Sequence, residues 1–167
     1  GEIDVLVANA GICEEALVGS SEGLDVWRRV MAVNLDGVFH CLSHARLRDG
    51  GRVIAVSSGL GKCGRAGKAA YAASKHGVLG LVRSLAEEWA PRRVTVNAVC
   101  PGWVDTAMAR ADVARNGLER DVVEAAIPLG RFVTPGEVAA LIAFLASPAA
   151  SAITGQAYNI SGGEVCA

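Results

Sequence analysis

The sequence has no hydrophobic run that could span a membrane. Its longest apolar stretch, residues 138–146, is much shorter than the roughly 20 residues that a bilayer-spanning helix requires. The first residues, from Gly1 to Asp4, show neither the basic nor the apolar region of a secretory signal peptide, so we expect none there. An excess of charge is absent as well. The net charge of -1 gives no electrostatic reason to expect nucleic acid or an anionic membrane as a partner.

Cysteine pairs with a recognisable spacing are also absent. The number of cysteines is odd, and none stand as Cys-x-x-Cys; they are Cys13, Cys41, Cys63, Cys100 and Cys166. This pattern favours free thiols in a reducing compartment over a disulfide framework or a zinc site. It predicts a cytoplasmic protein with no bound metal. Glycine, by contrast, is abundant, and its 20 residues indicate many tight turns or close backbone approaches.

Short apolar segments rich in β-branched residues alternate with longer amphipathic ones. Strands are expected at residues 3–8, 52–56, 94–99 and 157–160. Helices are expected from a cap at Ser20 or Ser21 to about Leu42, at residues 68–89, and at residues 134–146 after a capping box. Residues 103–126 read as irregular, with one or two helical pieces. The alternation predicts one α/β domain with a mainly parallel sheet.

Three polar segments that contain glycine or proline follow three of these strands. They are Asn9-Ala10-Gly11, Ser57-Ser58-Gly59 and Pro101-Gly102. Carboxyl ends of parallel strands lie at the same edge of a sheet, and ligands bind outside that edge. The sequence therefore predicts that the three segments converge on one ligand site.

Tyr71 and Lys75 stand four residues apart in the second helical segment, and therefore on one face of the helix. A nearby ammonium favours the ionised form of a phenol. Lowering the phenol pKa from about 10 to about 7 requires about 4 kcal/mol of differential stabilisation. A tyrosine poised in this way can exchange a proton with an alcohol or carbonyl oxygen. Taken alone, the pair is more typical of an ordinary helix surface.

Two further polar residues accompany this pair. Ser58 follows the second strand, and its hydroxyl could bond the same substrate oxygen, although serine is also common in plain turns. Asn34 lies inside the apolar pattern of the first helical segment. Because a buried asparagine needs hydrogen-bond partners, Asn34 either stabilises a local kink or holds a water in a proton path. The residues themselves leave both alternatives open.

In combination, the motifs of this chain resemble those of the short-chain dehydrogenase/reductase family, in the right order and over nearly the whole length. The matching segments are residues 4–11 (DVLVANAG), 33–39 (VNLDGVF), 57–58 (SS), 71–75 (YAASK), 97–102 (NAVCPG), 104–106 (VDT), 128–131 (PLGR), 153–156 (ITGQ) and 162–163 (GG). The resemblance implies a Rossmann-like, doubly wound parallel sheet. It also implies an enzyme that moves a hydride between NAD or NADP and a carbonyl or secondary alcohol, with the choice of cofactor open.

The resemblance assigns a role to each matched residue. Tyr71 would be the general acid/base, and Lys75 would lower its pKa and bind the nicotinamide ribose. Ser58 would hold the substrate oxygen, and Asn34 would seat a water that links Lys75 to solvent. The implied cofactor-binding residues are Asn9, Ala10, Gly11, Tyr71, Lys75, Pro101, Gly102, Val104 and Thr106. Residues 107–126 correspond to the family's variable substrate lid.

Within the family, the motifs most resemble those of 3-oxoacyl-carrier-protein reductases and polyketide ketoreductases. Residues 74–78 (SKHGV) and 96–102 (VNAVCPG) carry this resemblance. A small-molecule ketone or alcohol substrate and a homodimer or homotetramer are therefore implied. His76 is interpreted as a helix-face residue. The cations Lys62, Arg65 and Lys68 are interpreted as a solvated loop, with attraction of an acidic acyl carrier as the alternative.

The chain departs from the family pattern at its start. The family begins with a strand, a glycine-rich pyrophosphate loop and a helix, and about 80 residues of that pattern have no counterpart before Asp4. We therefore expect residues 1–167 to form a single partial domain, the C-terminal two-thirds of the fold, with strand 3–8 at an open edge. A truncated, inactive paralogue acting as an interaction subunit is the alternative function, and a cofactor-sensing module is a third.

Overall fold

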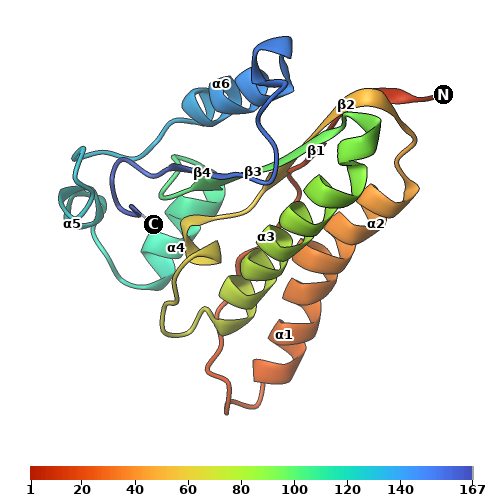
Figure 1. Cartoon of the computed structure of the whole chain (residues 1–167). Helices are drawn as coiled ribbons and strands as arrows, with labels where there is room; N and C mark the ends of the chain where they lie inside the picture. The colour runs from red at the N-terminus through yellow and green to blue at the C-terminus, as the bar shows by residue number, and fades with distance from the viewer. Residues whose placement is uncertain (167) are drawn as a thin grey trace.

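A computed structural model describes residues 1–166, which form a parallel sheet between two layers of helices (Figure 1). The strands lie side by side in chain order: β1 (Ile3–Ala8), β2 (Leu47–Val56), β3 (Thr95–Pro101) and β4 (Ala157–Ile160). The helices are α1 (Gly23–Met31), α2 (Gly37–His44), α3 (Ala69–Trp89), α4 (Ala107–Arg115), α5 (Arg120–Ala125) and α6 (Pro135–Ala146). The predicted Rossmann-like α/β fold is confirmed.

The central strands have apolar side chains on both faces of the sheet. Val53 and Ala55 of β2 belong to the core cluster beneath α2 and α3, whereas Ile54 between them packs with Leu145 of α6. All seven residues of β3 are buried. Side chains alternate between the faces of a strand, so a strand covered by helices on both sides reads as a continuous apolar run. This explains why the short apolar segments were recognisable as strands.

A wide helical turn separates α1 from α2. Residues 32–36 form a π-helical segment that places Asn34 in the buried stripe of the two helices. The stripe recurs at every fourth residue: Val26, Val30, Asn34, Val38 and Leu42. In a straight α-helix, each step of four residues turns the stripe by about 40°, so it would leave the core within a few turns. The π turn holds more residues per turn and brings the stripe back.

The boundaries differ from prediction in several places. The first helix begins after Glu22, and the expected Ser20 or Ser21 cap is wrong, because the Ser20 hydroxyl donates to the Leu17 carbonyl instead. Strand β2 begins at Leu47, five residues earlier than expected, and its first half is irregular, with Gly50 at φ of 77° and a shifted register against β1.

The remaining boundaries agree more closely. Strand β3 ends at Pro101, two residues later than expected, and β4 has the predicted bounds. Helix α6 opens with the predicted capping box, in which the Thr134 hydroxyl accepts from the Glu137 amide and the Glu137 carboxylate accepts from the Thr134 amide. Residues 103–126, expected to be irregular, contain the two short helices α4 and α5.

Strand β1 is an edge of the described sheet, as predicted. It pairs only with β2 in residues 1–166, and Val5 and Val7 remain 41% and 40% exposed. Apolar side chains on an unpaired parallel edge are unusual, since all-parallel sheets are normally covered on both faces. The exposed face of β1 therefore has the character of a surface that another segment covers.

No helix within residues 1–166 combines the length and the apolar character needed to cross a membrane.

Candidate active site

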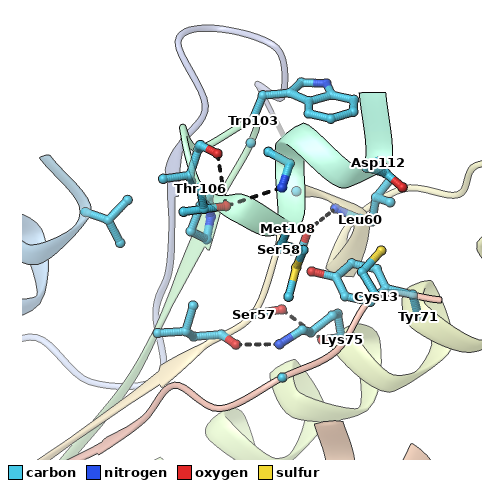
Figure 2. Close-up of a pocket in the computed structure, with 18 of the residues that line it drawn as sticks. Cys13, Ser57, Ser58, Leu60, Tyr71, Lys75, Trp103, Thr106, Met108 and Asp112 are labelled. Carbon is cyan, nitrogen blue, oxygen red and sulfur yellow. Dashed lines mark hydrogen bonds between the residues drawn. The ribbon is translucent and has the colours of Figure 1, made fainter. Parts of the chain in front are cut away.

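A cavity of about 910 Å³ opens at the carboxyl ends of the strands (Figure 2). The three segments that the sequence predicted to converge all line it, and so do helices α4 and α6. Every residue proposed as cofactor-binding lies on its wall: Asn9, Ala10, Gly11, Tyr71, Lys75, Pro101, Gly102, Val104 and Thr106. Ser58 lies there too, whereas Asn34 stands behind the wall.

Tyr71 and Lys75 face the cavity from the first two turns of α3. The Lys75 ammonium lies 5.7 Å from the centre of the Tyr71 ring and donates a 2.8 Å hydrogen bond to the Val56 carbonyl at the end of β2. This is the one protein acceptor for that ammonium within residues 1–166, which leaves two of its three N–H groups for a ligand. A ligand with hydroxyl groups fits this position.

Ser58 lies opposite Tyr71, immediately after β2. Its backbone is extended, and its Oγ accepts a 3.1 Å hydrogen bond from the Leu60 amide, which caps a short 3-10 turn at residues 59–61. The Leu60 bond fixes the oxygen and leaves the Ser58 proton free to be donated. Hydrogen bonding between Ser58 and Tyr71 lowers the pKa of the phenol. The two hydroxyls therefore face a common point in the cavity.

Burial dominates the electrostatics of the pair on α3. It raises the pKa of Tyr71, more than the Ser58 hydrogen bond and the charge of Lys68 lower it. Burial also lowers the pKa of Lys75 to about 8, which still leaves this ammonium mostly protonated at neutral pH. Lys75 was predicted to lower the pKa of Tyr71. The pKa of the phenol is nevertheless raised, because its desolvation outweighs the effects that lower it.

Asn34 is fully buried and holds the chain beneath the cavity. Its side-chain amide donates to the Ile12 carbonyl at 2.9 Å and accepts from the Ile12 amide at 2.8 Å. It also donates to the Ser74 hydroxyl, which in turn donates to the Tyr71 carbonyl. A Cβ at Gly11 would lie only 3.3 Å from Asn34 Oδ1 and 3.4 Å from Lys75 Nζ. Asn34 thus connects the segment after β1 to the helix that carries Tyr71.

The structure also places residues in the cavity wall that the sequence analysis did not assign to the site. Cys13, Trp103, Met108 and Asp112 line the cavity. The prediction that Lys68 belongs to a solvated loop is wrong, because Lys68 is 2% exposed and paired with Asp112 and Glu15. Burial of an ion pair between distant segments leaves no local sequence signal, so only the three-dimensional structure reveals it.

The other two cations of that loop are less buried. Arg65 is exposed and pairs with Glu164 at 3.1 Å. Lys62 donates a 2.8 Å hydrogen bond to the Ala157 carbonyl and is half-buried. His76 is exposed on α3, and its Nδ1 lies 2.9 Å from the Ala72 carbonyl, in agreement with its interpretation as a helix-face residue. No three His, Cys, Asp or Glu side chains in residues 1–166 form a group that could hold a metal ion.

Comparison with known proteins identifies clear relatives. A family model described as Enoyl-(Acyl carrier protein) reductase matches residues 1–164. The chain is 43% identical, over 168 residues, to the 3-oxoacyl-acyl-carrier-protein reductase FabG of Vibrio cholerae, covering 98% of the chain and 67% of the relative.

Solved structures give the same result. An actinorhodin polyketide ketoreductase with NADPH superposes with a TM-score of 0.86 at 38% identity, over 98% of this chain and 68% of that one. A blue fluorescent protein from a metagenomic library, in complex with NADPH, superposes with a TM-score of 0.90 at 37% identity, over 99% and 66%. The chain therefore spans about two thirds of the length of the relatives that it matches.

Proposed function

Since the chain belongs to the short-chain dehydrogenase/reductase family of oxidoreductases, we propose that it reduces the ketone of a small molecule, a 3-oxoacyl compound or a similar ketone, with NADPH or NADH. The observation that carries the proposal is the convergence of Ser58, Tyr71 and Lys75 on one cavity at the carboxyl ends of the strands. The names of the similar proteins, a 3-oxoacyl reductase and a polyketide ketoreductase, support the ketone class.

The proposed proton chemistry uses two hydroxyls. The Ser58 hydroxyl donates a hydrogen bond to the substrate carbonyl oxygen. It can do so because the hydrogen bond from the Leu60 amide holds Ser58 Oγ in place and leaves its proton free. The Tyr71 phenol donates its proton to the same oxygen as negative charge develops there. A tyrosine with a raised pKa is fully protonated at neutral pH, which suits an acid in the reductive direction. In the reverse direction, the phenolate takes the proton from an alcohol.

The cavity fits a nicotinamide dinucleotide, which supplies the hydride when bound. Lys75 has two N–H groups for the ribose hydroxyls. Gly11 brings its backbone close to Lys75 and Asn34, where a side chain would crowd both. The other proposed contacts are Asn9, Ala10, Pro101, Gly102, Val104 and Thr106, all on the same wall. Asn34 and Ser74 position α3 and thereby Tyr71, and the water proposed beside Asn34 would continue the proton path from Lys75.

We further propose that residues 1–167 form one partial Rossmann-type domain and that the protein is a cytoplasmic homodimer or homotetramer. Support for self-association comes from apolar side chains exposed along the segment of α1 and α2: Trp27 at 41%, Val33 at 38% and Phe39 at 52%. The free thiols of the five cysteines support a reducing compartment. Light scattering on the full-length protein tests the oligomer, and the monomer mass would contradict it.

The alternative of an inactive paralogue has no support among the relatives. The test of the proposed function is reduction of a panel of 3-oxoacyl thioesters and simple ketones by the full-length protein, followed through the nicotinamide absorbance with NADPH and with NADH. We expect turnover with at least one cofactor and loss of turnover in Tyr71→Phe. Absence of turnover with every combination would contradict the proposal.

A further inference from the structure

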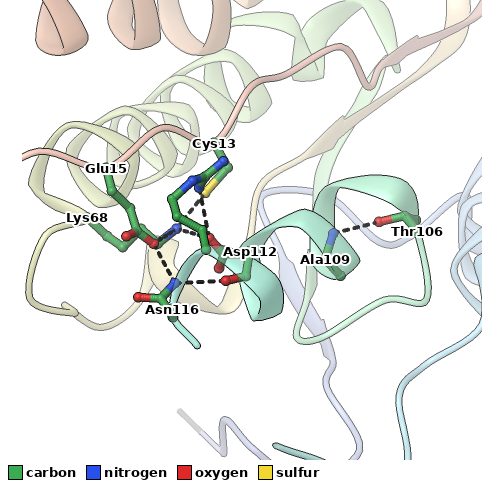
Figure 3. A network of polar contacts seen from close by, with 8 residues as sticks. Cys13, Glu15, Lys68, Thr106, Ala109, Asp112 and Asn116 are labelled. Carbon is green, nitrogen blue, oxygen red and sulfur yellow. Dashed lines mark hydrogen bonds and ion pairs between the residues drawn. The ribbon is translucent and has the colours of Figure 1, made fainter. Parts of the chain in front are cut away.

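A buried ionic cluster lies at the start of α3 (Figure 3), and its residues Lys68 and Asp112 line the same cavity as the proposed reacting groups. The Lys68 ammonium contacts Asp112 Oδ1 at 2.5 Å, Cys13 Sγ at 3.2 Å and the Glu15 carboxylate. An ammonium has three N–H groups, and these three acceptors use all of them. Lys68 therefore lines the cavity without a free N–H group for a substrate. Its role is to stabilise the cavity wall by joining the segments that form it.

The cluster joins three segments that are far apart in the sequence. Glu15 belongs to the loop after β1, Lys68 precedes α3, and Asp112 lies on the lid helix α4. Asn116, just beyond α4, donates to the Glu15 carboxylate at 3.1 Å and to the Asp112 carbonyl at 2.9 Å. Burial opposes ionisation of Glu15, but hydrogen bonds from Lys68 and Asn116 lower its pKa to about 2. Burial also opposes the charge of Lys68, but its hydrogen bonds to Asp112 and Glu15 outweigh burial and raise its pKa, so Lys68 and Glu15 are both charged in the neutral range.

A second cavity of about 370 Å³ lies on the other side of this cluster. Five residues line both cavities and so mark the boundary between them: Arg65, Lys68, Trp103, Asp112 and Glu164. The second cavity has an apolar part formed by Leu118, Val123 and Ile127, from the end of the lid. An apolar chain that extended from the main cavity would enter this space if the boundary were open.

We propose that the Lys68–Asp112 pair is a specificity-determining partition, which separates the two cavities and thereby limits the length of the acyl chain that the substrate carries. The proposal rests on the proposed ketone reduction. Lys68 and Asp112 are 2% and 9% exposed, and Asp112 is additionally held by Arg115 at 3.3 Å. Because three segments hold this ion pair in place, a substrate displaces it less easily than it would displace a single flexible side chain.

The experiment compares 3-oxoacyl thioesters that differ by two methylene groups, with wild type and Asp112→Ala in the full-length protein. Removal of the Asp112 carboxylate opens the boundary, and the ratio of kcat/KM for the longer over the shorter substrate should rise about tenfold, the value of burying two methylene groups. Asp112→Asn keeps the size of the side chain and should leave the ratio close to that of wild type. An unchanged ratio in folded Asp112→Ala would overturn the proposal.

A second substitution identifies where the extra chain goes. Leu118 lines only the second cavity, so Leu118→Trp should leave the wild-type ratio unchanged and should abolish the gain in the Asp112→Ala background. If the gain survives the tryptophan, the chain does not enter the second cavity and the proposal is wrong. Where Asp112→Ala fails to fold because Lys68 loses a buried partner, the double variant Lys68→Ala/Asp112→Ala removes both charges and answers the same question.

A binding measurement separates the partition from the catalytic proposal. An acyl thioester without the 3-oxo group cannot be reduced, but its chain can still enter the cavity. In Asp112→Ala this compound should slow hydrogen exchange in α5, whose Val123 lines the second cavity, and in wild type it should not. Protection in the variant supports the partition even if no thioester is reduced. Equal exchange in both proteins contradicts the partition even if every thioester is reduced.

Discussion

Asn34 and Ile12 form a reciprocal pair, in which the asparagine amide both donates to the Ile12 carbonyl and accepts from the Ile12 amide. Asn97 on β3 also bridges the backbone in both directions, donating to the Ile153 carbonyl and accepting from the Gln156 amide. We call each of these two-way asparagine bridges a clip. Both side chains are fully buried. Only the first clip is linked, through Ser74, to the backbone of Tyr71. The two asparagines therefore provide a matched comparison of structural and functional effects.

We predict that Asn34→Leu and Asn97→Leu each lower the free energy of unfolding by about 3 kcal/mol, because each leaves a partly buried backbone amide and carbonyl without their side-chain partner. Their effects on turnover should differ. Asn34→Leu should lower kcat by about 100-fold through displacement of Tyr71, while Asn97→Leu should retain most of it. Urea unfolding and steady-state kinetics on the full-length variants measure both quantities. Equal losses of kcat would show that Asn34 acts on stability alone.

Tyr71→Phe removes one oxygen atom and keeps the ring in place. We expect kcat to fall by at least about 100-fold, the contribution of a general acid, with little change in dinucleotide affinity. Stopped-flow kinetics and titration of NADPH fluorescence measure these quantities. Full activity of the variant would contradict the assigned role, and a parallel loss of dinucleotide binding would indicate a binding role instead. Ser58→Ala should reduce kcat less, because the phenol retains its proton.

The pKa of Lys75 predicts a dependence of stability on pH. Burial lowers this pKa from 10.5 to about 8, so between these values the unfolded chain binds more protons than the folded one. The contribution of Lys75 to stability therefore rises with pH across that window, and the cost of burying the ammonium is present in full below it. The unfolding free energy of wild type relative to Lys75→Met should increase by on the order of 3 kcal/mol from about pH 7 to about pH 10.5. A difference independent of pH would contradict this expectation.

The 167 residues expressed alone should bind NADPH weakly or not at all. They cover about two thirds of the length of the relatives, two of which have structures with NADPH, and the family's glycine-rich phosphate loop has no counterpart in the sequence. Most of the ionic recognition of a dinucleotide resides in such a loop. Titration calorimetry with NADPH measures the affinity. A micromolar dissociation constant would mean that the described cavity provides the whole binding site.

Local sequence patterns predicted most of the fold, because the β-branched runs located the four strands. The spacing of Ser58, Tyr71 and Lys75 did not by itself identify a site, and their roles came from the resemblance of the combined motifs to the short-chain dehydrogenase/reductase family. Two features had no local signal. The π turn at Asn34 depends on how α1 and α2 both pack on α3. The periodicity of the sequence alone predicts one straight helix there. The Lys68–Asp112 pair joins residues 44 positions apart, so Lys68 resembled a surface cation.

The π turn at residues 32–36 also makes the site sensitive to chain length at that place. The π turn contains one residue more than a regular α-helix would need between α1 and α2. Deletion of one residue between Asn34 and Val38 would therefore give a regular α-helix in which one step of the stripe is three residues long, and the stripe would still face the core. Insertion of a further residue would instead rotate the stripe of α2 by about 100°, away from the sheet. We therefore expect this turn to tolerate the loss of one residue after Asn34 better than the gain of one.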